Sequence, residues 1–212
     1  MAQMKPPLPE PLPPDPLPLV ADWMADAAAR IRNSTSMALA TVDPDGRPTA
    51  RMVICRGFDA SAGWLVFYTD RESDKGAQLR AVPRAALVFH WDAVERQIRV
   101  DGPVTLAPDA DSDRYWSTRP PEARAAAAAS RQSRPLASRA ELLARVAEET
   151  ERARDGVERP MRWGGYRVWA QRVELWVGQP GRVHDRARWS RDLTQVGVGY
   201  AGGPWRATRL MP

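Results

Sequence analysis

Residues 37–69 contain short, mainly apolar runs separated by turn and loop residues, and this pattern predicts consecutive β-strands, in which side chains alternate between the two faces. The expected strands cover residues 37–42, 49–56 and 63–69, and the Asp-Pro-Asp-Gly sequence at 43–46 is typical of a tight turn. Strands that follow one another with short connections predict an antiparallel meander, which would begin a larger sheet or a barrel.

Helical spacing of apolar residues appears elsewhere in the chain. A helix is expected from Leu17 to about Arg32, and another from a cap at Ser73 to the residue before Pro83. Residues 111–119 are also expected to be helical, and residues 125–129 are compatible with a helix.

The Ser-Arg-Ala-Glu sequence at 138–141 fits a capping box, which predicts a helix that reaches about Arg154. Leu142, Leu143 and Val146 would face inward. Further strands are expected at residues 85–91, 95–106, 165–170, 172–177, 186–190 and 205–210. The predicted fold class is therefore mainly β with flanking helices (α+β).

Prolines are concentrated at the start of the chain, with eight among the first 18 residues. Because proline fixes φ and has no amide hydrogen, residues 1–16 are expected to be an extended, disordered arm. Residues 17–212 would form a single domain, since a chain of this length can bury one sizeable core.

The composition narrows the class of protein. No apolar stretch approaches the length of a membrane span and no signal-peptide pattern is seen, so a cytoplasmic protein with no membrane partner is expected. Cys55 is the only cysteine, and His90 and His184 are the only histidines. These counts exclude an internal disulfide and argue against a metal site built from cysteine or histidine.

The net charge of +5 does not come from a basic patch in the sequence. Arginines are interspersed with acidic residues, so a nucleic-acid partner is not expected. Lys5 and Lys75 are the only lysines. Because arginine is so common here, a retained lysine is the better indication of a position that needs an ammonium group.

A few residues have chemistry that could serve an anion. Lys75 follows the expected helix start, where free backbone amides and an ammonium group would form an anion site. Tyr115 and Arg119 are four residues apart on a helix face, an arrangement that suits a phosphate. Arg51 and Arg56 point to opposite faces of their strand. Each feature also occurs in ordinary connecting helices and exposed strands, so none assigns a ligand by itself.

The order and spacing of several short motifs add information that the single features lack. They are RMVICR at 51–56, FYT at 67–69, SDKG at 73–76, ERQ at 95–97, Tyr115 with STRP at 117–120, SRQS at 130–133, WGGYR at 163–167, ELW at 174–176, RVHDR at 182–186 and RLMP at 209–212. Together they resemble the pyridoxine/pyridoxamine 5′-phosphate oxidase family over residues 15–212. The resemblance implies a split β-barrel of the Greek-key type that binds FMN at a homodimer interface, with a C-terminal dimerisation region.

The resemblance also implies a set of FMN contacts. Arg51 and Lys75 would hold the FMN phosphate, with Tyr68 and Thr69 on the same mononucleotide. The other implied FMN contacts are Met52, Val53, Ile54, Gln97, Gln132, Ser133, Trp176 and Arg186. One position departs from the family: Asp74 stands where many members have an arginine, which removes a cation beside the phosphate site.

The implied substrate is a phosphorylated pyridine. Arg182 and His184 would be the catalytic residues that position its ring over the flavin, and Tyr115 and Arg119 would hold its phosphate. Arg56 would contact the substrate in place of the family's lysine.

Two departures affect this substrate site. Ala123 replaces a serine that donates a hydrogen bond to the substrate phosphate. The proline-rich arm shows no sign of the arginine and tyrosine pair that covers the pocket in well-studied members. Both changes remove contacts that a phosphorylated substrate would use.

Three functions are compatible with these residues. The resemblance favours an oxidase that converts pyridoxine or pyridoxamine 5′-phosphate to pyridoxal 5′-phosphate, with oxygen as acceptor and hydrogen peroxide as product. A related FMN-dependent oxidase of an unphosphorylated aromatic intermediate, as in phenazine biosynthesis, would fit the loss of a donor at Ala123. A non-catalytic flavin- or pyridoxal-phosphate-binding protein would not require Arg182 and His184.

Overall fold

The sheet is arranged around β6 (Arg96–Leu106), which has different neighbours at its two ends. In the computed structural model, residues 96–101 of this strand pair with β8 (Arg172–Val177), whereas residues 104–106 pair with β7 (Trp163–Trp169). Gly102 lies where the partner changes, and a Cβ atom there would be 1.9 Å from the carbonyl oxygen of Trp169. Only glycine leaves room for this close approach of two backbones.

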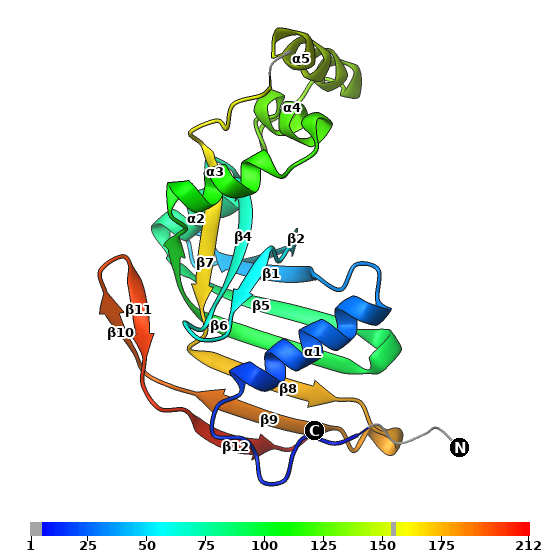
Figure 1. Cartoon of the computed structure of the whole chain (residues 1–212), viewed down its shortest axis with the longest axis vertical. Coiled ribbons are helices and arrows are strands. Elements are labelled where there is room, and N and C mark those ends of the chain that lie inside the picture. The colour runs from blue at the N-terminus through cyan, green and yellow to red at the C-terminus, as the bar shows by residue number, and fades with distance from the viewer. Residues whose placement is uncertain (1–5, 154–155) are drawn as a thin grey trace.

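The structure describes residues 6–153 and 156–212. The main antiparallel sheet runs in the order β12-β9-β8-β6-β5-β1-β2, and β4 joins it by pairing with β7 and with β3 (Figure 1). The other strands of this sheet are β1 (Ser36–Val42), β2 (Pro48–Ile54), β3 (Gly57–Asp59), β4 (Trp64–Asp70), β5 (Arg84–Trp91), β9 (Asp185–Ser190) and β12 (Arg206–Leu210). A separate hairpin consists of β10 (Leu193–Val196) and β11 (Gly199–Gly202), which the sequence pattern did not predict.

The helices lie outside the sheet. In Figure 1, α1 crosses one face of the sheet, whereas α3, α4 and α5 extend the molecule beyond one end of β4 and β7. The helices are α1 (Leu17–Arg30), α2 (Asp74–Ala81), α3 (Asp109–Ser117), α4 (Pro121–Ala129) and α5 (Arg139–Arg152), with short 3-10 turns η1 (Asp92–Val94) and η2 (Pro180–Arg182). The mainly β fold class with flanking helices is confirmed.

The predicted meander is wrong in its pairing. β1 and β2 form the expected hairpin, but β4 pairs along its whole length with β7. The residues expected to be a loop before β4 contain β3, which pairs with β4 in place of β2. Strand pairing depends on contacts between distant parts of the chain, which alternation within one segment does not reveal.

The main core lies between the sheet and α1. Fully buried side chains from the sheet include Phe67, Phe89 and Trp189, and α1 contributes Val20 and Ala27. A smaller core of Trp116, Ala125, Val157 and Trp163 joins α3 and α4 to the start of β7. This second core fixes the helices beside the end of β4.

The expectation of a disordered arm is wrong for residues 6–16, which pack against the C-terminal strands. The side chain of Leu8 is only 2% exposed, and its amide donates to Asp185 Oδ2 at 2.7 Å. Trp189 Nε1 donates to the carbonyl oxygen of Pro13 at 2.8 Å. Prolines that cannot donate hydrogen bonds can still present carbonyls and apolar surface, so an extended segment packs without forming a strand. Residues 1–5 of the expected arm lie outside the described residues.

The Ser138 cap of α5 is confirmed, and its inward face is confirmed only in part. Ser138 Oγ accepts from the amide of Glu141 at 3.1 Å. Val146 is partly buried against the second core and Leu142 is half-buried, but Leu143 is 51% exposed. The expected end of this helix near Arg154 lies outside the described residues. None of the helices in residues 6–153 and 156–212 is long and apolar enough to cross a membrane.

Candidate functional site

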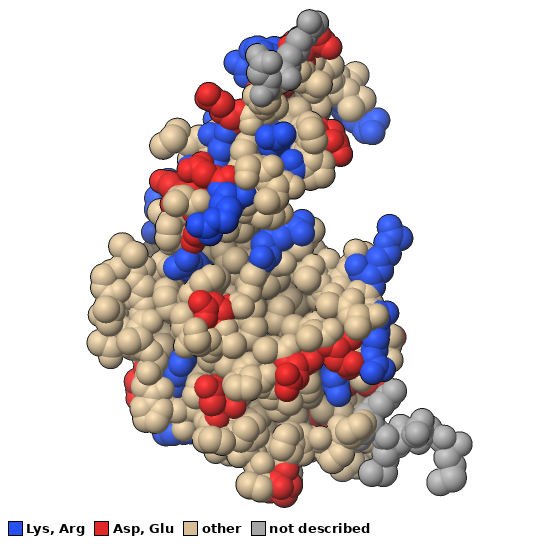
Figure 2. All heavy atoms as spheres, in the orientation of Figure 1, with Lys and Arg blue, Asp and Glu red and all other residues tan. Residues whose placement is uncertain are grey.

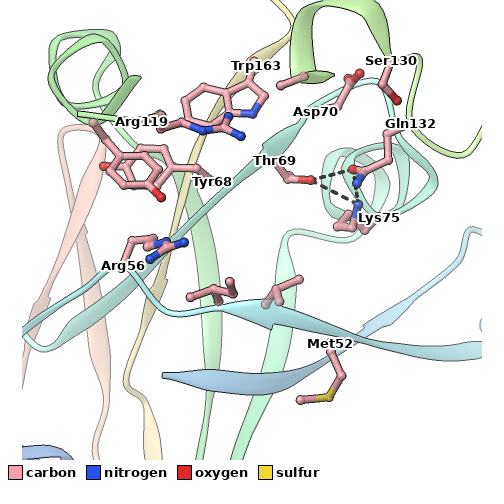
Figure 3. Close-up of a pocket in the computed structure, with 14 residues that line it drawn as sticks. Met52, Arg56, Tyr68, Thr69, Asp70, Lys75, Arg119, Ser130, Gln132 and Trp163 are labelled. Atoms are coloured by element: carbon pink, nitrogen blue, oxygen red, sulfur yellow. Dashed lines mark hydrogen bonds between the residues drawn. The ribbon is translucent and has the colours of Figure 1, made fainter. Parts of the chain in front are cut away.

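A pocket of about 310 Å³ lies where β2, β4 and α2 meet the ends of α3 and α4 (Figure 3). It brings together residues that are far apart in the sequence. Of the predicted site residues, Met52, Val53, Ile54, Arg56, Tyr68, Thr69, Lys75, Tyr115, Arg119 and Gln132 line it. Asp70, Ala127, Ser130 and Trp163 also line it.

The first functional group of the pocket is a polar cluster around Lys75. Lys75 Nζ donates to Gln132 Oε1 at 2.6 Å and to the hydroxyl oxygens of Thr69 and Ser73, each at 3.1 Å. Thr69 Oγ1 also donates to Gln132 Oε1 at 2.9 Å. These four residues are called the Lys75 cluster below. Figure 3 shows Thr69, Lys75 and Gln132 pointing toward one another from three different elements.

The backbone at the start of α2 places Lys75. A Cβ at Gly76 would lie 2.1 Å from the carbonyl oxygen of Arg71, so only glycine lets the helix begin this close to the end of β4. Ser73 occupies the N-cap position, but its side chain does not cap the helix as expected. Its hydroxyl instead donates to the carbonyl oxygen of Asp70 at 2.6 Å and accepts from Lys75.

Burial destabilises the charged form of Lys75. Loss of water contact, and next the nearby charge of Arg51, lower the pKa of Lys75 to about 8, against the opposing effect of Asp70 and Asp74. Around Lys75, Gln132 and the two hydroxyls supply neutral acceptors. An anion in the pocket would therefore gain a charge-assisted contact that these neutral groups do not provide.

A stack of aromatic rings forms a second wall of the pocket. The ring of Tyr68 lies 4.4 Å from that of Tyr115 and 5.5 Å from that of Trp163, centroid to centroid. Gly165 makes room for this stack, because a Cβ there would be 2.8 Å from Tyr68 Cε1. The wall is suited to a planar ligand that lies against aromatic rings.

Arg119 lies on this wall, across the pocket from Lys75 in Figure 3. Its guanidinium lies 4.8 Å from the ring centroid of Trp163, and its Nη2 donates to the carbonyl oxygen of Ala123 at 2.9 Å. Nη1 is buried and has no hydrogen-bond partner among the described residues. Burial lowers the pKa of Arg119. A buried cationic donor without a partner is a candidate contact for an anion.

Arg51 lies in β2, whereas Arg56 lies two residues beyond its end, so the expected strand that reaches Arg56 is shorter in the structure. Arg56 faces the pocket, with its guanidinium 5.5 Å from the ring centroid of Tyr115. Arg51 does not line the pocket: its Nη2 donates to Thr49 at 2.7 Å and to Gln78 Oε1 at 3.0 Å, and its Nη1 donates to Thr41 at 2.6 Å. Its charge still acts on Lys75, as the lowered pKa shows.

The remaining predicted residues, except Ser133, form a second group on the C-terminal strands. Gln97 is opposite Trp176 in the β6–β8 pair, and Trp176 is opposite Arg186 in the β8–β9 pair. The ring of His184 lies 4.7 Å from that of Trp176, and its Nδ1 accepts from the amide of Gln179 at 3.1 Å. Arg182 is in η2, close to His184 in sequence, with φ of 61°. These five residues (Gln97, Trp176, Arg182, His184 and Arg186) are called the C-terminal group below.

The structure therefore does not bring all predicted residues into one pocket. No member of the C-terminal group lines the pocket, and Ser133 is exposed beside it with φ of 71°. Arg186 is held by Glu174 Oε1 at 2.8 Å and by the carbonyl oxygen of Met211 at 3.0 Å. Charged residues of both signs are interspersed on the face in Figure 2, which is hollowed between the helices and the sheet.

Sequence reasoning missed several residues of the pocket. Trp163 belongs to a quoted motif and could have been found there, because an aromatic residue beside two glycines indicates close packing. Ser130 begins the quoted SRQS motif and could also have been found there, whereas Asp70 had no signal in the sequence, since it is an ordinary residue at the end of a strand. Gln78 supports Arg51 from within α2, where it resembles any polar helical residue.

Comparisons with known proteins agree with this geometry. The family described as pyridoxamine 5′-phosphate oxidase matches residues 24–153. A second family, described as the pyridoxine 5′-phosphate oxidase C-terminal dimerisation region, matches residues 163–212. The first match contains every residue of the pocket except Trp163, and the second contains Trp163 and the C-terminal group except Gln97.

Individual relatives cover nearly the whole chain. A pyridoxine/pyridoxamine 5′-phosphate oxidase of Anaeromyxobacter dehalogenans is 45% identical over 208 residues, which cover 97% of this chain and 100% of the relative. Its counterpart in Gluconobacter oxydans is 42% identical over 93% of this chain and 94% of its own. The crystal structure of PhzG from Burkholderia lata, in complex with tetrahydrophenazine-1-carboxylic acid, has a TM-score of 0.84 and 31% identity over 94% of each chain.

Proposed function

The chain belongs to the pyridoxamine 5′-phosphate oxidase family, and we propose that it oxidises pyridoxine or pyridoxamine 5′-phosphate to pyridoxal 5′-phosphate with FMN as cofactor. Oxygen is the acceptor and hydrogen peroxide the product. The observation that carries the proposal is one pocket with two separate candidate anion contacts, Lys75 at one side and, at the other, the Nη1 of Arg119, which has no hydrogen-bond partner within residues 6–153 and 156–212. A phosphorylated cofactor and a phosphorylated substrate together need two such contacts.

The residues on the Lys75 side fit an FMN phosphate. A phosphate dianion requires several charge-assisted donors, and Lys75 and Thr69 already direct theirs to one point, the Oε1 atom of Gln132. The start of α2 adds backbone amides beside them. Arg51 contributes long-range positive charge from beneath the pocket. Asp74 is exposed and offsets part of this charge.

The residues on the Arg119 side fit the phosphate of a substrate. Arg56, Tyr115 and Arg119 come from the connection between β2 and β3, from α3 and from the residues just after α3, and all three line the pocket. Two guanidinium groups can bind one phosphate through paired donors. The stacked rings of Tyr68 and Tyr115 exclude water from one side of the site. This arrangement orients the substrate's aromatic ring beside the cofactor.

The C-terminal group would complete the site from a second chain. Met52 and Ile54, at the rim of the pocket on the edge strand β2, are 66% and 43% exposed, which leaves apolar surface uncovered. We propose a homodimer in which one chain supplies the pocket and the partner supplies residues of the C-terminal group. The match of residues 163–212 to a dimerisation region supports this assembly.

Within this assembly, Arg182 and His184 would face the substrate ring and hold it in the reactive orientation. FMN, when bound, supplies the two-electron oxidation. The chain contributes orientation, charge for the two phosphates and exclusion of water. Gln179 fixes the ring of His184, because the backbone amide of Gln179 donates to Nδ1 of the ring. The Nε2 atom is then left to face the substrate.

Oxygen consumption by the FMN-loaded protein tests the proposal. With pyridoxine and pyridoxamine 5′-phosphate we expect turnover that saturates, with pyridoxal 5′-phosphate appearing in parallel. Arg182→Ala and His184→Ala should lower kcat/KM by about a hundredfold while FMN remains bound. A loaded wild-type protein that oxidises neither compound would refute this function.

The second candidate function is oxidation of an unphosphorylated aromatic compound. Two observations favour it: Ala123 lacks the donor expected for a substrate phosphate, and PhzG shares the fold at 31% identity. The retained Arg56, Tyr115 and Arg119 speak for a phosphorylated substrate. Flavin reduction by an unphosphorylated aromatic acid, with none by the phosphorylated pyridines, would support the second candidate.

A further inference from the structure

Arg162 lies directly before β7 and contacts two elements at once. Its Nε donates to Asp70 Oδ2, at the end of β4, at 3.1 Å. Its Nη2 donates to the carbonyl oxygens of Ala127, Ala128 and Ser130 at 3.2, 2.6 and 2.9 Å. Only 12% of the Arg162 side chain and 8% of the Asp70 side chain are exposed, so these contacts are largely shielded from water.

The three carbonyls belong to the C-terminal end of α4. The last carbonyls of a helix have no partner within the helix, and they carry the negative end of its dipole. A guanidinium has several donors in one plane, so it can serve these carbonyls and a carboxylate together. Arg162 therefore joins the end of α4 to the end of β4.

The segment that follows α4 carries Gln132 into the Lys75 cluster. Every side chain of residues 131–140 is exposed, so no apolar burial holds this segment in place. Gln132 itself is held by its bonds to Lys75 and Thr69. The rest of the segment is attached by an ion pair between Arg131 and Glu72 at 3.0 Å, with both side chains more than half exposed, and by a bond from Arg134 to the Glu72 carbonyl at 3.1 Å. Exposed ion pairs contribute little to stability. The buried contacts of Arg162 thus restrain the backbone that leads into Gln132 more strongly than these exposed contacts do.

We propose that Arg162 is a positioning residue that sets the place of Gln132 over Lys75 and thereby the affinity of the pocket for a phosphorylated cofactor. Asp70 is its counter-charge, and Ser130 is the last carbonyl that it holds before Gln132. Neither Arg162 nor Asp70 belongs to the quoted motifs or to the predicted contacts. It rests on the proposed function for the identity of the cofactor, FMN.

A double-variant cycle tests whether Arg162 acts through Gln132. The variants are Arg162→Leu, Gln132→Ala and both together, and the FMN dissociation constant is measured by titration of flavin fluorescence. We expect each single variant to bind FMN about tenfold more weakly, as for other residues that orient a ligand contact. The double variant should bind FMN no more weakly than the single variant that has the higher dissociation constant. If the fold-loss of FMN affinity in the double variant equals the product of the two single fold-losses, the residues act independently and the proposal is overturned.

The matched control is Arg145→Gln. Arg145 is paired with Glu141 on α5 at 2.5 Å, in the same helical region, so its ion pair lies within α5 and does not hold residues 127–132. Removing it should leave FMN affinity unchanged. An equal loss in Arg145→Gln would show a general effect of losing an arginine and would overturn the role assigned to Arg162.

Hydrogen exchange in the FMN-free protein separates this inference from the proposed function. The amides of Ser130 and Arg134, which donate to Ala126 and Arg131, should exchange several-fold faster in Arg162→Leu than in the wild type. Unchanged exchange would overturn the positioning role. A wild-type protein that binds no FMN would refute the cofactor assignment, while the exchange rates would still decide whether Arg162 holds the segment.

If Arg162→Leu does not fold, Arg162→Lys is the variant to test. Lysine keeps a cation beside Asp70, but its single ammonium cannot reproduce the planar set of donors. We expect the lysine variant to fold and to bind FMN several-fold more weakly. Wild-type affinity together with wild-type exchange in Arg162→Lys would overturn the requirement for the contacts to all three carbonyls.

Discussion

The pocket and the C-terminal group differ in how much of their chemistry one chain provides. The pocket is lined by elements that contribute to both cores, and it contains a buried lysine and a buried guanidinium nitrogen that has no hydrogen-bond partner in the part of the chain that the structure describes. In the C-terminal group, Arg186 is already paired with the buried Glu174, and the residues lie along a row of neighbouring strands. The pocket therefore offers buried cationic groups that an anion can bind, whereas in the C-terminal group the charge of Arg186 is already paired.

This difference indicates how the proposed site is divided. Cations that are desolvated without an anionic partner raise the free energy of the folded chain, so they are retained where a ligand can offset the cost. Surface residues whose charges are already paired carry no such cost. We therefore expect changes in the pocket to alter ligand affinity directly, and changes at the exposed edge to alter assembly.

The largest effect is expected from charges on the exposed edge of β2. Met52→Glu combined with Ile54→Glu would place like charges in the proposed interface, so the dimer should dissociate at least about a hundredfold more readily. Sedimentation would measure assembly, and flavin absorbance would measure occupancy. Val198→Glu is the control, because Val198 is 83% exposed between β10 and β11. A monomeric double variant that binds FMN like the wild type would show that one chain suffices.

Loss of the buried lysine should have the next largest effect. Lys75→Met removes a charge-assisted contact that is worth about 1.5 to 3 kcal/mol, so FMN should bind tenfold to a hundredfold more weakly. Arg206→Met is the matched control on the C-terminal strands, where Arg206 pairs with Asp192 in an exposed ion pair. If both variants bind FMN equally well, the contrast between the two regions is wrong.

The pH dependence of FMN binding should follow Lys75. Its pKa of about 8 in the free protein means that the ammonium is lost as the pH rises through 8. FMN affinity should therefore change little near pH 7, where Lys75 is charged and the FMN phosphate is mostly a dianion, and fall by up to about tenfold per pH unit above 8. The stability of the FMN-free protein should change in the opposite direction: a lowered folded-state pKa destabilises the protein below 8, and this penalty is relieved between 8 and the unfolded value of 10.5. Lys75→Met should abolish both trends.

The smallest effect is expected at Ala123. Ala123→Ser restores a hydroxyl donor on the Arg119 side, and a new hydrogen bond of about 1 kcal/mol should lower KM for pyridoxamine 5′-phosphate roughly fivefold. Ala126→Ser, at an exposed position of the same helix, is the control. An unchanged KM would weaken the assignment of this side of the pocket to a substrate phosphate.

Local features of the fold could be predicted from the sequence. The Ser138 cap of α5 forms as expected, and α1 begins at Leu17. The strands at residues 85–91 and 172–177 are found within one residue of their predicted limits. Each of these depends on neighbours within a few residues, so its physical cause lies inside the segment itself.

The pairing of β4 could not be predicted in this way. Its alternating pattern identified a strand, but its partner, β7, lies about a hundred residues further along the chain. Leu143 shows the same limit, because helical spacing marks an apolar face without showing that any element packs against it. The packing of Leu8 was missed for the opposite reason, since prolines suggested disorder where a distant aspartate and apolar surface were available.

For the site, the sequence by itself determined the types of residue and, through the ordered motifs, the family to which they belong. Only the tertiary structure decided that Lys75, Thr69 and Gln132 meet at one point, that Arg51 lies beneath the pocket, and that the C-terminal group lies apart from it. The physical reason is that motif spacing reports chemistry along the chain. Burial, pKa and the reach of a side chain instead depend on which distant elements pack together.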